Sequence, residues 1–131
     1  MQYSEFVGQV QHRAGVPGEE EAVKSIRATL ETLSERLAGD EHKHLAAQLP
    51  DEIGRYLTQV QGTESFTPEE FVERVRKREG SETPEATHHV RTVFSVLQEA
   101  VSAGEFDDVR AQLPDEYETL FRIEGQGQEG P

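Results

Sequence analysis

The sequence predicts an all-α fold in which two tandem four-helix repeats pack as one pseudo-twofold helical bundle. The string Ala-Gln-Leu-Pro-Asp-Glu occurs at residues 47–52 and again at 111–116, an offset of 111 − 47 = 64. Carried backwards, this offset aligns apolar positions of the two copies: Ala22 with Ala86, Ile26 with Val90, Leu33 with Leu97 and Leu45 with Val109. No stretch alternates apolar and polar residues over a useful length, so no strand is expected.

The first half is expected to form helices at about residues 4–14, 19–38, 40–48 and 50–60. Ser4 is placed to cap the first helix, and the glycines and proline of residues 15–18 end it. The second helix carries apolar residues at spacings of three and four, the pattern of an amphipathic helix. Gly39 is expected to end it in the left-handed conformation.

The second half repeats this order, with helices from about residue 67 to the break at residue 80, and at about 84–102, 105–112 and 114–123. Thr67 is expected to cap the first of these ahead of Pro68, and Thr83 the next. The chain is therefore predicted to be a single helical domain, 1–122, with repeats at about 4–60 and 67–122 joined by a hinge at 61–65. Residues 123–131 are expected to be a flexible glycine-rich tail.

The repeated string is interpreted as a corner between two helices. Its members in the two copies are Gln48, Leu49, Pro50 and Asp51, and Gln112, Leu113, Pro114 and Asp115. Proline suits the first position of a helix, and the following acids are favoured by the helix dipole. The leucine is expected to be a buried peg, and the glutamine to bond the free carbonyls of the helix that it ends. The alternative is a twofold binding site built from Gln48 and Gln112.

Length and charge restrict the classes of function. A chain of 131 residues can bury one core but not two robust ones. Its 26 acidic and 13 basic residues give a net charge of −13, which repels nucleic acids and anionic membranes. The expected partner is therefore a basic or neutral protein. The acidic excess also suits a salt-rich cytoplasm, although an ordinary acidic protein is the simpler alternative.

Cysteine is absent from the sequence, which excludes disulfides, thiolate zinc sites and a cysteine nucleophile. This composition fits a reducing cytoplasm. No apolar run reaches the length of a membrane span, about 18 residues, and the amino terminus does not resemble a signal peptide. A cytoplasmic location is expected, and the oligomeric state is left open.

No side-chain constellation indicates catalysis, a metal or a cofactor. His42 and His44, and His88 and His89, have the wrong spacing for metal ligands on one helical face, so both pairs are expected to lie on a solvated surface. Acidic runs at residues 19–21, 69–70 and 107–108 are explained by helix starts. Nucleophile and phosphate-loop motifs are absent.

Arg27 and Arg91 occupy equivalent positions beside the apolar stripes of the two long helices. The structural interpretation is that each pairs with a glutamate or bonds carbonyls at a helix end, and that each could close its own corner near Asp51 or Asp115. The functional interpretation is a pair of partner or anion contacts.

Two segments carry a resemblance to a known family. Residues 33–37, Leu-Ser-Glu-Arg-Leu, followed by 45–50, Leu-Ala-Ala-Gln-Leu-Pro, resemble the domain of unknown function 2267 family, and the resemblance extends over most of the chain. It implies a small helical cytoplasmic prokaryotic protein without an assigned activity. The second copy departs from the pattern, because Ala100 stands where the first has Arg36.

The sequence therefore predicts a non-catalytic protein-interaction or regulatory module. The alternative is a small-molecule or cation-binding protein that uses a pocket between the two repeats. A deep apolar cleft between the halves with convergent polar groups would favour the alternative, whereas a flat exposed patch of several hundred Å² would favour a partner surface.

Overall fold

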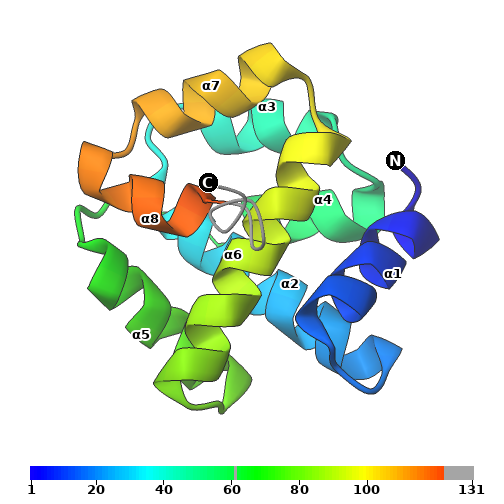
Figure 1. The fold of residues 1–131 in the computed structure, drawn as a ribbon. Coiled ribbons are helices and arrows are strands. Elements are labelled where there is room, and N and C mark those ends of the chain that lie inside the picture. Colours follow the sequence, from blue (N-terminus) through cyan, green and yellow to red (C-terminus); the bar gives the residue numbers. More distant parts are fainter. Residues whose placement is uncertain (61, 123–131) are drawn as a thin grey trace, which may run out of the picture.

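The computed structural model describes residues 1–60 and 62–122. Within these ranges the chain forms α-helices and one short 3-10 helix, and no strand, so the all-α prediction is confirmed (Figure 1). Gln61 in the predicted hinge and the predicted tail at 123–131 lie outside the described residues. The elements are α1 (Tyr3–Ala14), α2 (Glu19–Arg36), α3 (Glu41–Ala47), α4 (Asp51–Thr58), α5 (Pro68–Glu79), α6 (Thr83–Ala100), α7 (Ala103–Ala111), η1 (Asp115–Tyr117) and α8 (Glu118–Phe121).

The two long helices, α2 and α6, contact each other at the centre of the molecule, and the other helices surround them (Figure 1). Helix α1 packs against α2 and also against α6 of the other half, while α5 packs against α6 and also against α2. Helix α7 lies against α3, so the halves meet at this end as well.

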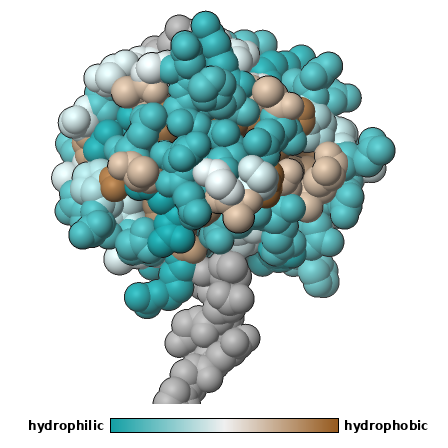
Figure 2. Space-filling view, turned by 90° about the horizontal axis from the view of Figure 1, so that it is seen from above, coloured by the Kyte–Doolittle hydropathy of each residue, from teal (hydrophilic) through white to brown (hydrophobic). Residues whose placement is uncertain are grey.

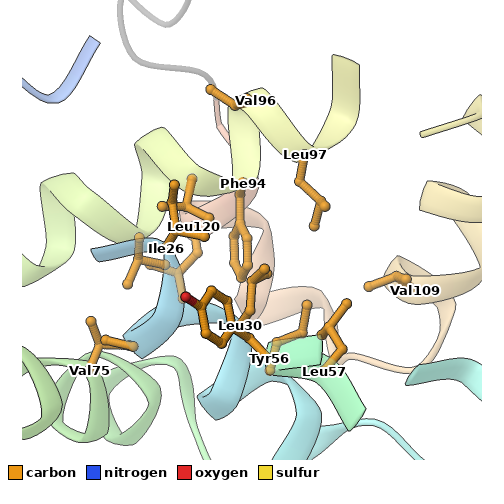
Figure 3. Close-up of a cluster of buried hydrophobic side chains, with 14 of the residues drawn as sticks. Ile26, Leu30, Tyr56, Leu57, Val75, Phe94, Val96, Leu97, Val109 and Leu120 are labelled. Carbon is orange, nitrogen blue, oxygen red and sulfur yellow. The ribbon is translucent and has the colours of Figure 1, made fainter. Parts of the chain in front are cut away.

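The core lies between the long helices and the shorter ones that cover them. Figure 3 shows Ile26 and Leu30 of α2 near Phe94 and Leu97 of α6, all four without solvent exposure. Phe94 stacks on Phe121 of α8 with ring centroids 5.0 Å apart. Burial of such side chains stabilises the fold by about 1.5–3 kcal/mol each. The halves thus share one apolar cluster.

Helix lengths follow the predicted repeat register. Helices α1 and α5 have 12 residues each, and α2 and α6 have 18 each. Gly15 after α1 and Gly80 after α5 have φ angles of 70° and 72°, in the left-handed region that glycine adopts without steric cost. The pseudo-twofold relation between the halves remains a prediction.

The cap of α5 agrees with the prediction from the sequence. The Thr67 hydroxyl accepts a hydrogen bond from the Glu70 amide at 3.1 Å, and the Glu70 carboxylate accepts one from the Thr67 amide at 2.8 Å. This capping box satisfies two free amides at the start of the helix.

Other predicted boundaries are wrong by one or two residues. Ser4 lies inside α1, whose N-cap is Gln2, and Thr83 begins α6, whose N-cap is Glu82. Helix α2 ends at Arg36 because Leu37 is extended, with ψ 142°, so Gly39 with its φ of 66° shapes the following turn instead of ending the helix.

The carboxyl-terminal helix also differs from its prediction, because the segment begins as the 3-10 helix η1 before α8.

No helix in the described part of the chain has the length and apolar character needed to cross a membrane.

Candidate functional site

A pocket of about 390 Å³ lies where the first half of α2 meets the end of α5 and the start of α6. The loop after α1 and residues Lys24 and Ser25 of α2 form one wall. Glu79 and Ser81 at the end of α5, with His88 and His89 of α6, form the other. The pocket therefore lies between the predicted repeats, and its polar groups come mainly from the second.

Glu79 is the centre of a buried polar cluster in this pocket. Its side chain is only 3% exposed. Nδ1 of His89 lies 2.9 Å from Glu79 Oε2, and the Ser81 hydroxyl donates to Glu79 Oε1 at 2.8 Å. Ser25 Oγ lies 3.1 Å from the same Nδ1. The cluster joins α2, α5 and α6.

Hydrogen bonds keep Glu79 ionised despite its burial. Burial alone would raise the pKa of this carboxyl, but hydrogen bonds from His89, Ser25 and Ser81 outweigh it and hold the pKa below its ordinary value. An ionised carboxylate only accepts hydrogen bonds, so Nδ1 of His89 carries a proton. Nε2 of His89 makes no hydrogen bond with a described residue, and His89 lines the pocket, so in the neutral imidazole this nitrogen is an acceptor for a ligand.

The arrangement of Ser25, His89 and Glu79 is not that of a catalytic triad. A triad histidine uses one ring nitrogen for the serine and the other for the acid. Here Ser25 and Glu79 both contact Nδ1. Because that nitrogen already donates to Glu79, it cannot take a proton from Ser25. The cluster can orient the imidazole and leave Nε2 to accept a hydrogen bond from a ligand.

The histidines do not lie on a solvated face, and this prediction is wrong for three of the four. His89 belongs to the cluster, and His88 Nε2 lies 3.3 Å from the carbonyl of Ala14, to which it donates. His42 is 7% exposed, and its Nε2 has no hydrogen-bond partner among the described residues. His44 is exposed. Packing of the halves against each other covers side chains that helical spacing alone would leave outside.

A second titratable cluster joins α3 and α7. One carboxylate oxygen from each of Glu41, Glu105 and Asp108 lies within 4.8 Å of the other two, an arrangement that can attract a hard cation. Glu105 is 9% exposed, and Oε2 of Glu41 and Oε2 of Glu105 are buried without a hydrogen-bond partner in the described ranges. Burial, contact with Glu41 and the charges of Glu41 and Asp108 raise the pKa of Glu105 to about 7.

Residues 3–120 match the family described as an uncharacterized conserved protein, DUF2267. The chain belongs to this family. The match covers all of the described helices except the last residue of α8, and so confirms the resemblance of the two quoted segments. A comparison with curated proteins gives no match.

Arg36, which this DUF2267 chain carries in one half only, contacts the other half. Its Nε donates to the carbonyl of Phe66 at 3.3 Å, and its guanidinium lies 5.5 Å from the centre of the Tyr117 ring. The Tyr117 hydroxyl donates to the same carbonyl at 2.5 Å. A structural role beside the linker explains why one copy of this arginine suffices.

The glutamines of the repeated string bond the opposite half instead of the helix that each follows. Oε1 of Gln48 accepts a hydrogen bond from the Ser102 amide at 2.7 Å. Oε1 of Gln112 accepts one from the Ala38 amide, also at 2.7 Å. These amides are free because the chain becomes extended after α2 and after α6. Gln48 and Gln112 therefore stabilise the contact between the halves.

The rest of the string forms the turn before the next helix. Leu49 and Leu113 are 7% and 8% exposed. Pro50 and Pro114 are N-caps with extended ψ angles of 145° and 159°, one position earlier than predicted. Asp51 and Asp115 lie in the first turns of α4 and η1.

Arg27 and Arg91 differ in surroundings, and neither closes a corner with Asp51 or Asp115. Nε of Arg27 donates to Glu31 at 3.0 Å, one turn along α2. Nε of Arg91 donates to the carbonyl of Thr119 at 3.0 Å. Arg27 lines an open groove between α2 and α5 together with other basic residues, whereas Arg91 lies outside this groove.

Sequence reasoning missed Glu79 and Glu105, two of the three buried glutamates. Glu79 ends a helix whose last turn is otherwise basic and gives no local sign of burial. A signal does exist for their partners. Two contacting pairs are separated by 64 residues, which is the repeat offset. They are Ser25 with His89, and Glu41 with Glu105.

Proposed function

We propose that this DUF2267 protein is a non-catalytic regulatory module that binds a small polar ligand in the pocket between its halves. The observation that carries the proposal is the orientation of His89 by buried Glu79, which leaves Nε2 as an acceptor in a pocket of about 390 Å³. That volume lies in the range of small-molecule sites, about 300–1,000 Å³.

The energetics of the cluster support binding over a purely structural role. A buried carboxylate must lose its hydration, and its protein hydrogen bonds only offset that cost. In the first helix of each half the predicted register has an offset of 65 residues, so Ala14 is the equivalent of Glu79, while at the offset of 64 Ser25 is the equivalent of His89. The first half therefore builds the same corner with small side chains, and the fold does not require a carboxylate there.

The lining favours a ligand with hydrogen-bond donors or a positive charge. Nε2 of His89 can accept a hydrogen bond, and Glu21 and Glu85 supply negative charge at exposed positions of the lining. Among the residues that line this pocket, Lys24 is the one basic residue that is not a histidine. A small amine or a hydroxylated molecule meets these conditions.

The surface gives less support to an apolar docking face. Within the described ranges, Met1 is the one large apolar residue that is exposed. On the face shown in Figure 2, hydrophilic side chains predominate and apolar ones are scattered. Association through a contiguous apolar patch is therefore disfavoured.

The test is a titration of the full chain with a panel of small amines, polyols and amides, followed by amide NMR shifts. His89→Asn is the informative variant, because the asparagine amide can replace Nδ1 as the donor to Glu79 while Nε2 is lost. We expect hits to shift amides at residues 15–25 and 79–89 and to weaken about tenfold in His89→Asn. The matched control is His44→Asn on exposed α3. Equal binding by both variants, or the absence of any hit, would refute the proposal.

A second proposal, supported by the net charge of −13, is that the acidic surface binds a basic or neutral protein. Binding should weaken as salt rises, and duplex DNA should not bind. Salt-resistant capture of a partner, or a DNA shift at low salt, would contradict it. The absence of cysteine from the sequence supports a cytoplasmic location as part of this proposal.

A further inference from the structure

A groove of about 430 Å³ between α2 and α5 concentrates positive charge on an otherwise acidic protein. Its cationic lining residues are Lys24 and Arg27 of α2 with Lys77 and Arg78 of α5. These include two of the three lysines in the chain. Glu31 and Glu79 also line the groove, so its formal charge is +2.

The charges of the groove are arranged in layers. The side chains of Glu31 and Glu79 are 12% and 3% exposed, whereas those of Arg27 and Lys77 are 61% and 70% exposed. Lys24 is also exposed. Buried acids therefore form the floor, and a ligand approaching from solvent meets cations first.

The floor acids are already neutralised by groups of the protein. Glu31 Oε2 accepts from Nε of Arg27 at 3.0 Å, and Glu31 Oε1 lies 3.5 Å from Nε of Arg78. Glu79 is bound by the histidine and serines of the neighbouring pocket. Repulsion between the floor and a bound anion is reduced accordingly.

The arginines are held in position, and the lysines remain available. Nη1 of Arg78 donates to Thr32 Oγ1 at 2.6 Å and to Glu35 Oε1 at 3.0 Å, which fixes its guanidinium. Lys24 makes no hydrogen bond or ion pair with the described residues. Lys77 has only Glu73 at 4.0 Å. Fixed guanidiniums beside free ammonium groups are suited to phosphoryl oxygens.

We propose that this groove binds a small phosphorylated molecule with two or more phosphoryl groups. The small size follows from the charge distribution. With +2 in the groove and −13 overall, the rest of the chain carries −15, so a long polyanion extending beyond the groove would meet repulsion. The groove is separate from the pocket that contains His89, although both include Lys24 and Glu79.

The experiment is calorimetric titration of the full chain with inorganic pyrophosphate at low salt, with sodium sulfate as the comparison anion. Lys77→Gln is the test variant, because Lys77 is exposed and does not line the His89 pocket. Lys43→Gln is the matched control: Lys43 is the third lysine, 63% exposed on α3, and its removal changes the net charge equally. We expect pyrophosphate to bind more tightly than sulfate, Lys77→Gln to lose about tenfold in affinity, and Lys43→Gln to retain it.

Three results would overturn the proposal: no binding of pyrophosphate by the wild-type chain, equal affinity for sulfate, or equal losses in Lys77→Gln and Lys43→Gln. Amide shifts induced by pyrophosphate should map to α2 and the end of α5, and shifts confined to other helices would also overturn it. Failure of the His89 pocket to bind amines leaves these results unaffected, because the test variant does not touch that pocket.

Discussion

Replacement of Glu105 by glutamine should stabilise the protein above neutral pH. Glu105 of α7 is 9% exposed, and its Oε2 lies buried without a hydrogen-bond partner in the described ranges. The acidic neighbours that act on it are Glu41 of α3 and Asp108 of its own helix. Ionisation therefore places charge in a site that favours the neutral acid. Glutamine keeps the shape of the side chain and never ionises.

The magnitude follows from the pKa of Glu105, which burial and Glu41 raise from 4.5 to about 7. The folded protein binds more protons than the unfolded chain between these values, so the contribution of Glu105 to stability is fully present below pH 4.5 and is lost as pH rises through about 7. The difference corresponds to about 3 kcal/mol at pH 8 or above. Glu105→Gln should recover most of this free energy.

Urea unfolding at pH 5, 6, 7 and 8 measures the effect. We expect the free energies of unfolding of wild type and Glu105→Gln to be close at pH 5 and to diverge by about 2–3 kcal/mol at pH 8. Asp107→Asn is the control, because Asp107 is exposed on the same helix and its replacement removes the same charge. The prediction would be refuted if the free energies of unfolding of wild type and Glu105→Gln changed in parallel with pH, or if Asp107→Asn gained as much stability. Either result would show that ionisation of Glu105 does not destabilise the fold.

Three further predictions concern the core, the pocket and the surface. Leu113→Ala should lower the free energy of unfolding by about 2–5 kcal/mol in urea, since Leu113 is 8% exposed, and a loss below about 0.5 kcal/mol would contradict its role as a peg. The pKa of Glu79 is lowered, so its stabilisation is present above its ordinary value and is lost as pH falls through the folded pKa. The free energy of unfolding of Glu79→Gln should therefore fall less than that of wild type as the pH is lowered. An equal fall in both proteins would contradict this prediction. Neutral salt raised from low to physiological strength should increase Tm, because a screening length of about 8 Å weakens the self-repulsion of a chain at −13; a fall in Tm would refute this.

Local rules predicted the helices well because each boundary is set by a few neighbouring residues. Thr67 shows this, since its side chain, the following proline and Glu70 complete one capping box. Errors arose where tertiary contacts decide the outcome. Gln48 is near in sequence to the carbonyls it was expected to bond, but the free amide of Ser102 in the other half is its partner.

A pocket between the repeats was the alternative in the sequence analysis, but the residues that form it were missed for a related physical reason. His89 was judged by its spacing from His88 on one helix, although Ser25 corresponds to it in the repeat register. Residues close to a twofold axis, however, lie beside their own equivalents. A pair separated by the repeat offset is then a candidate contact, and Ser25 with His89 at 3.1 Å is such a pair.

In the predicted register, some contacts between the halves occur twice, and others occur only once. Arg13 pairs with Glu99 at 2.7 Å, and Arg78 pairs with Glu35 at 3.0 Å. Both pairs join the two halves, and the second consists of the equivalents of the first. Gln48 with Ser102 and Gln112 with Ala38 behave in the same way. In the predicted register these polar contacts occur twice, once in each direction, and they join the halves in addition to the shared apolar core.

Glu79 and His89 have no such counterpart, because Ala14 and Ser25 occupy the equivalent positions. If both halves carried the acid and the imidazole, four polar groups would compete for one space at the centre. With small residues on one side, the second half can bury a hydrogen-bonded carboxylate, orient a single imidazole and leave room of about 390 Å³ beside it. Divergence between the halves thus gives the pocket Glu79 and His89 on one side, with Ala14 and Ser25 at the equivalent positions on the other. This asymmetry is the physical basis for the proposal that the pocket binds a ligand, whereas the repeated corners join the halves.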